Sequence, residues 1–261
     1  MTFPAFSPFM RNPDREKIFR FKRFEVANHL SAMKVGTDGV LLGAWALSRR
    51  EGIGLLPPAR ILDVGCGTGL IALMMAQRFP GADIYGIEID PSAAAEASAN
   101  FRNSPWSERL TVTEGDFTSV FPGAYNKPFD LIVSNPPFFT NGEHSPEAAR
   151  LVARHEKTLP LETLLSISSK ILSPQGSLCL VLPADRESDL KFLSVANRLA
   201  VSRLTLVSTV PSKHPRRLLA ELRHASVIEG GMPTDHLSLH DSSGGFTKDY
   251  HSLVKDFYLN L

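Results

Sequence analysis

The feature of this chain that most constrains its fold is an apolar segment that runs into three closely spaced glycines and then into a second apolar segment. Residues 60–64 predict a buried strand, and residues 70–78 predict a helix. Gly65, Gly67 and Gly69 lie between them. Glycine lets the backbone turn tightly and approach a bound molecule closely. A strand, a glycine turn and a helix in this order therefore predict an α/β fold with a ligand at the turn.

Strand-like and helix-like segments continue to alternate along the chain. The predicted strands cover residues 60–64, 84–89, 110–114, 131–134, 177–182, 202–208 and 218–228, and the predicted helices cover residues 39–49, 70–78, 91–103, 161–172 and 185–199. Such alternation predicts parallel strands joined by right-handed crossovers, with a closing antiparallel pair at the end. We expect a seven-stranded, mostly parallel sheet with helices on both faces.

The length of 261 residues is consistent with one large domain and a small extension. We expect an N-terminal extension over residues 1–55, which includes a short hairpin at residues 19–26, and an α/β domain over residues 56–261. The proline pair at positions 57 and 58 marks the junction.

Bulk properties exclude several classes of protein. The formal net charge of +1 gives no chain-wide signal for nucleic acid, so any such affinity depends on local patches. No apolar run reaches the length of a membrane span. Cys66 and Cys179 lack the spacing of metal ligands, and we expect no metal. A cytoplasmic enzyme is the simplest interpretation, and the sequence does not indicate an oligomeric state.

Two details of the glycine turn favour S-adenosyl-L-methionine (SAM) over a dinucleotide as the ligand. The spacing Gly65-x-Gly67-x-Gly69 lacks the Gly-x-x-Gly end of the dinucleotide motif. Asp63 precedes the first glycine by two residues, and its carboxylate could reach the ammonium group of SAM. The same carboxylate would repel a pyrophosphate. Asp63, Gly65, Gly67 and Gly69 are therefore predicted to bind SAM.

Carboxylates also end the next two predicted strands. Glu88 closes the second strand, where a nucleoside-binding α/β fold places the acceptor for the ribose hydroxyls. Asp116 follows the third strand, where it could hold the adenine amine. An exposed carboxylate at a strand end is the ordinary explanation for either residue alone. Their order at successive strand ends favours ligand binding.

The segment Asn135-Pro136-Pro137-Phe138 follows the fourth predicted strand and indicates a chemistry. The amide oxygen of Asn135 and the carbonyl of Pro136 can each accept one hydrogen of a planar amine, and the ring of Phe138 can stack on the base that carries it. Adjacent prolines fix the backbone and remove N–H donors. The alternative is a strand that ends at prolines and enters an ordinary loop.

The glycine turn, Glu88, Asp116 and residues 135–138 together resemble the Rossmann-like class I SAM-dependent methyltransferases. Residues 135–138 resemble the Asn/Asp-Pro-Pro-Tyr/Phe motif of enzymes that methylate exocyclic or amide nitrogens. Further segments are similar to the bacterial tRNA (adenine-N6)-methyltransferases that act on valine tRNA, and these segments are residues 21–24, 33–45, 104–109 and 257–259. Phe138 departs from relatives that carry Tyr, and residues 140–154 look divergent.

The resemblance implies methylation of an adenine N6 amine next to the anticodon of valine tRNA, with Asn135, Pro136 and Phe138 as catalytic residues. The base must leave its stack to reach Asn135. Two basic stretches could contact the RNA, and their members are Arg20, Lys22 and Arg23 in one and Lys213, Arg216 and Arg217 in the other. Lys34, Thr37 and Asp38 could form a lid over SAM. Solvated charges and a plain glycine turn before a helix are the alternatives.

Other functions remain compatible with these motifs. An amino-methyltransferase that acts on rRNA, on DNA adenine or on a protein glutamine would use the same Asn-Pro-Pro chemistry. A DNA enzyme usually needs a target-recognition domain, for which 261 residues leave little room. A protein of another class, a non-catalytic RNA-binding protein on the same fold, would not require the intact segment 135–138.

Overall fold

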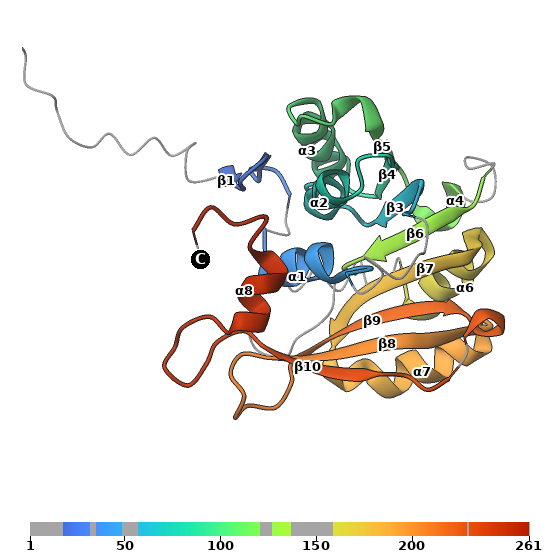
Figure 1. Ribbon diagram of the computed structural model, residues 1–261. Helices are drawn as coiled ribbons and strands as arrows, with labels where there is room; N and C mark the ends of the chain where they lie inside the picture. The colour runs from blue at the N-terminus through green and yellow to red at the C-terminus, as the bar shows by residue number, and fades with distance from the viewer. Residues whose placement is uncertain are drawn as a thin grey trace, which may run out of the picture.

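The structure is a computed structural model that describes residues 18–31, 35–48, 57–120, 127–136, 159–228 and 230–260. The strands of the central sheet are β3 (Arg60–Val64), β4 (Asp83–Glu88), β5 (Leu110–Glu114), β6 (Phe129–Ser134), β7 (Leu172–Pro183), β8 (Leu199–Ser208), β9 (Arg217–His224) and β10 (Thr234–Ser238). They lie in the order β10-β8-β9-β7-β6-β3-β4-β5, as Figure 1 shows. The predicted Rossmann-like arrangement is confirmed.

Over the described residues the sheet has eight strands, one more than the seven predicted. Strands β3 to β7 pair in parallel, and β9 is antiparallel to both β7 and β8, which confirms the predicted closing hairpin. The additional strand is β10, which pairs in parallel with the edge of β8. Its sequence, Thr-Asp-His-Leu-Ser, contains one large apolar residue, Leu237, so it lacks the apolar pattern that identifies a buried strand.

Helices cover both faces of the sheet. They are α1 (Thr37–Trp45), α2 (Leu70–Arg78), α3 (Pro91–Arg102), α4 (Phe117–Val120), α6 (Leu161–Ile171), α7 (Glu187–Ala196) and α8 (Lys248–Val254). One hydrophobic core includes residues of α1, α2, α3 and α8, and the other includes residues of α4, α6 and α7. Successive residues of β3 face opposite cores, since Ile61 lies in the first and Leu62 in the second.

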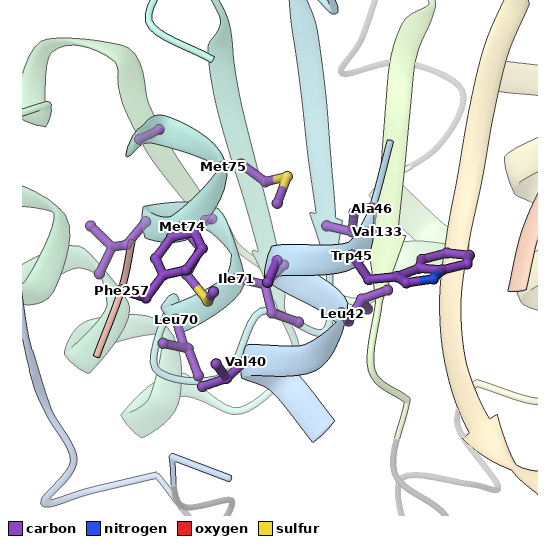
Figure 2. Close-up of a cluster of buried hydrophobic side chains, with 14 of the residues drawn as sticks. Val40, Leu42, Trp45, Ala46, Leu70, Ile71, Met74, Met75, Val133 and Phe257 are labelled. Carbon is purple, nitrogen blue, oxygen red and sulfur yellow. The ribbon is translucent and has the colours of Figure 1, made fainter. Parts of the chain in front are cut away.

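Helix α1 packs closely on α2, although it belongs to the predicted extension. Figure 2 shows Val40, Ile71 and Met74 in their shared interface. Gly43 makes the close approach possible, because a Cβ atom there would lie 2.5 Å from the sulfur of Met74. Arg78 of α2 donates hydrogen bonds to the carbonyls of Gly43 and Ala46, and so holds the end of α1.

A two-stranded hairpin precedes α1. It is formed by β1 (Ile18–Arg20) and β2 (Glu25–Ala27), in agreement with the prediction for residues 19–26. The hairpin contacts the end of the chain, because Phe21 pairs with Tyr258 and the amide of Lys22 donates to the carbonyl of Phe257.

Within the described ranges, no helix is long and apolar enough to cross a membrane, and no cluster of three His, Cys, Asp or Glu residues could hold a metal.

Candidate active site

The carboxyl ends of β3, β4 and β6 meet at one edge of the sheet, because these neighbouring strands are parallel and in register. A pocket of about 320 Å³ lies at this edge. Its lining consists of Val35, Gly36, Thr37, Asp38, Gly39, Gly65, Cys66, Gly67, Thr68, Leu70, Ile71 and Asn135. The structure thus brings together predicted site residues from three segments that are far apart in the sequence.

The three glycines of the turn have different surroundings. All have positive φ angles, of 67° at Gly65, 54° at Gly67 and 80° at Gly69, which L side chains rarely adopt. Gly65 and Gly67 line the pocket, and a Cβ atom at either would meet no atom closer than 3.9 Å. A Cβ atom at Gly69 would lie 2.4 Å from the ring of Phe101. Gly65 and Gly67 therefore leave room for a ligand, whereas Gly69 leaves room for α3.

Glu88 is the last residue of β4, and its side chain contacts the glycine turn. Its carboxylate accepts hydrogen bonds from the amide of Gly67 at 2.8 Å and from the amide of Asp90 at 3.0 Å. The side chain is buried. A carboxylate has about four acceptor positions, so these two bonds orient it and leave capacity for two hydroxyl groups. This arrangement fits the predicted role in binding a ribose.

Asp63 is fully buried at the end of β3. Its Oδ2 atom accepts a hydrogen bond from the amide of Ala72 at 3.0 Å, while its Oδ1 atom has no partner among the described residues. Burial raises the pKa of this carboxyl from 3.8 to about 7, and the negative charge of Glu88 adds to the shift. A buried acceptor without a partner, next to an open glycine turn, fits a cationic ligand such as SAM.

Asp116 does not line the pocket. It is half-buried just after β5, where its Oδ1 atom accepts hydrogen bonds from the amide and the hydroxyl of Thr118, both at 2.8 Å. These bonds hold the start of α4. For the predicted contact between Asp116 and adenine, a bound nucleoside would have to reach beyond the lined pocket, past Glu88 and toward β5.

Asn135 and Pro136 follow β6 directly. Asn135 is half-buried and lines the pocket, and Pro136 is buried. The hydroxyl of Ser134 donates to the carbonyl of Val64 at 2.7 Å, and this bond ties the end of β6 to the start of the glycine turn. Asn135 and Gly65 both line the pocket at this edge of the sheet. Phe138 and Lys34, which were predicted to act in catalysis and cofactor binding, lie outside the described residues.

The predicted RNA-binding residues occupy two places. Lys213 and Arg216 are exposed in the loop between β8 and β9, which lies at the same edge of the sheet as Asn135. The other three lie on the β1–β2 hairpin, where Arg20 pairs with Glu25 at 2.8 Å, Lys22 Nζ donates to the carbonyl of Lys255 at 2.6 Å, and Arg23 lies over the ring of Trp106 at 5.6 Å. Arg217 differs from these residues, because its Nε atom contacts Oδ2 of Asp38 at 2.7 Å and Asp38 lines the pocket.

Two buried residues of α3 were not predicted from the sequence. The carboxylate of Glu96 accepts hydrogen bonds from the amides of His29, Leu30 and Ser31. Asn100 donates to the carbonyls of Ala27 and Thr68 and accepts from the amide of Ala27. Together they fasten the segment before the pocket to the glycine turn. Their spacing of four residues on an alanine-rich helix is a weak signal that could have revealed a shared face.

The parallel sheet and the glycine turn with its surrounding carboxylates define a class I, SAM-dependent methyltransferase. Comparison with known proteins agrees. Residues 55–195 match the model of the methyltransferase small domain family. A predicted O-methyltransferase from Agrobacterium tumefaciens superposes with a TM-score of 0.65, over 86% of this chain and all of its own, at 21% sequence identity. That likeness shows the fold alone.

The chain belongs to the methyltransferase small domain family. It is 50% identical over 244 residues to the tRNA1(Val) (adenine(37)-N6)-methyltransferase of Porphyromonas gingivalis, covering 92% of this chain and 94% of that protein. Proteins of the same name from Parabacteroides distasonis and Yersinia pseudotuberculosis are 41% and 40% identical, over 97% and 93% of this chain and 100% and 92% of their own lengths. The resemblance seen in the sequence motifs is thus confirmed over nearly the whole chain.

Proposed function

We propose that this protein methylates the exocyclic N6 amine of adenine 37, beside the anticodon of tRNA1(Val), with SAM as the methyl donor. The names of its relatives support the substrate and the position. The observation that carries the proposal is the presence of Asn135 in the same pocket as Gly65 and Gly67. An amine held by Asn135 would lie beside the cofactor-binding turn.

The residues that line the pocket, together with Asp63 and Glu88 next to its glycine turn, fit SAM part by part. Glu88 would accept the ribose hydroxyls, with its carboxylate already oriented by the amide of Gly67. Asp63 would receive the ammonium group, directly or through water, since its Oδ1 atom is buried and has no partner in the described structure. Thr37 lies in the first turn of α1, where backbone amides have no helical partner and favour an anion such as the ligand carboxylate. SAM supplies an electrophilic methyl group on a sulfonium.

The chemistry required of the protein is orientation of a weak nucleophile. The lone pair of an aryl amine is delocalised into the ring, and two acceptors aimed at its hydrogens favour a more pyramidal nitrogen. Asn135 Oδ1 and the carbonyl of Pro136 would be these acceptors, and they would direct the lone pair at the methyl carbon. The methylated nitrogen is acidic, so its proton can leave to water and no strong base is needed.

We infer that the substrate approaches over the carboxyl edge of the sheet. Lys213 and Arg216 lie in the loop at this edge, and phosphate contacts from such residues position an RNA without reading its sequence. The hairpin residues Arg20, Lys22 and Arg23 would extend the contact, with the Arg23 side chain supported by Trp106. An anticodon loop offers an unstacked adenine that can enter the pocket.

The test is methyl transfer from labelled SAM by the purified protein to three substrates, which are unmodified tRNA1(Val), duplex DNA containing adenine, and a peptide containing glutamine. The proposal expects incorporation into the tRNA, and a large loss of it in an Asn135→Ala variant that still binds SAM. Incorporation into DNA or peptide alone would refute the proposed substrate, and no incorporation into any of the three would refute the proposed reaction.

A further inference from the structure

Two neighbouring arginines at the base of the β8–β9 loop have different surroundings. Arg216 is exposed, whereas Arg217 is half-buried and its Nε atom contacts Asp38 Oδ2 at 2.7 Å. The side chains at the two ends of this ion pair are 26% and 33% exposed. The sequence suggested one basic stretch with one role, but the structure separates its last two members.

The guanidinium of Arg217 is held in place by the strands around it. Arg217 is the first residue of β9 and lies in register with Pro183 of β7 and Val207 of β8. Its Nη1 atom donates to the carbonyl of Arg216 at 3.1 Å. The backbone of Arg216 is itself bonded to Val207 and Ala184. A cation fixed in this way can orient its partner, because few conformations are lost when the pair forms.

Asp38 is the partner, and it belongs to the cofactor pocket. It lies in the first turn of α1 and lines the pocket with Gly65 and Asn135. Arg217 engages its Oδ2 atom, and no described residue engages Oδ1. Gly36, the residue that precedes α1, provides no side-chain cap. Among the described residues, the ion pair between Arg217 and Asp38 therefore joins this turn to the central sheet through side chains.

We propose that Arg217 is a positioning residue for the cofactor. Arg217 acts through Asp38 and holds the first turn of α1 in place as a wall of the pocket. This inference rests on the proposed function and reassigns Arg217 from RNA contact to SAM binding, while Arg216 retains the RNA role. Without Arg217, the Asp38 carboxylate would be free to turn toward water, and the wall that faces the ligand would lose its fixed position.

The test separates the two roles on the full-length protein. SAM affinity is measured by calorimetry on the free enzyme, and tRNA binding is measured as a function of salt, for Arg217→Gln, Arg217→Lys, Asp38→Asn, the Arg217→Gln/Asp38→Asn double variant and Arg216→Gln. Arg186→Gln is the matched control, since Arg186 forms a similar ion pair with Asp189 at 2.9 Å and does not line the pocket.

Arg217→Gln should weaken SAM binding by roughly three- to tenfold, the range for a partly exposed charged hydrogen bond. In the Asp38→Asn background the same change should have no further effect, because the pair is already broken. Arg217→Lys should recover part of the affinity, and Arg186→Gln should leave SAM affinity unchanged. Arg216→Gln should instead reduce the salt slope of tRNA binding by about one.

The inference is overturned if Arg217→Gln leaves SAM affinity unchanged and reduces the salt slope, since Arg217 would then be an RNA contact. It is also overturned if Arg217→Gln lowers the melting temperature as Arg186→Gln does and SAM affinity does not move. The SAM measurement needs no RNA, so it remains decisive for Arg217 even where the proposed tRNA substrate fails.

Discussion

Replacing Asp63 by asparagine should remove a pH dependence of SAM binding near neutrality. The carboxyl of Asp63 is fully buried and its pKa is about 7, so about half of the molecules carry it protonated at that pH. An ammonium group pairs with the ionised form. SAM binding should therefore release a proton below pH 7, and the logarithm of the association constant should fall by up to one unit for each pH unit lost.

The magnitude follows from the shift itself. The difference between 3.8 and about 7 is about three pKa units, or about 4 kcal/mol between the two protonation states. Because the folded protein binds this proton more tightly than the unfolded chain, the stabilising contribution is present below about pH 4 and is lost as the pH rises through about 7. Bound SAM opposes that loss, so it should raise the melting temperature more at about pH 7 than at about pH 5.5.

The assay is isothermal titration calorimetry of SAM in two buffers that differ in ionisation enthalpy, at about pH 6 and about pH 7.5. Wild type should release close to one proton at the lower pH and less at the higher pH. Asp63→Asn should bind more weakly and release none from this site. The same proton release in wild type and Asp63→Asn would refute the assignment of Asp63 as the ammonium partner.

Three further changes test the remaining parts of the site. Glu88→Gln should weaken SAM binding by roughly 1–3 kcal/mol, the cost of a lost buried acceptor, and unchanged affinity by calorimetry would exclude the ribose contact. Gly69→Ala should lower the free energy of unfolding by about 1–3 kcal/mol in denaturant titration, since its Cβ would overlap Phe101. If Gly69→Ala costs the same free energy in a Phe101→Ala background, backbone strain and not overlap with the ring causes the loss. Asn135→Ala should lower kcat about a hundredfold with SAM affinity retained, and turnover near wild type would place the amine elsewhere.

The sequence predicts those parts of the site that depend on topology alone. Parallel strands bring their carboxyl ends to one edge, so Asp63, Glu88 and Asn135 could be placed together from their positions after apolar segments. The identity of a strand end and the chemistry of its side chain are both local information. Strand β10 was missed because an edge strand with one large apolar residue gives no such local pattern.

The remaining parts depend on contacts between distant segments. Arg217 and Asp38 are 179 residues apart, and nothing in the basic loop indicates that Arg217 pairs with Asp38. Glu96 contacts amides that lie 65 to 67 residues earlier. The different roles of Gly65 and Gly69 depend on the position of the Phe101 ring, which only the packing of α3 determines.

The measurement that tests the account most directly is nucleoside mass spectrometry of tRNA1(Val) after incubation with the protein and SAM, combined with nuclease mapping of the modified position. A matched transcript with guanine in place of adenine 37 serves as the control. The account predicts N6-methyladenine at position 37 and no incorporation in the control. Methylation on a ring nitrogen, on another nucleotide, or equally in the control would contradict the proposed orientation of the amine by Asn135.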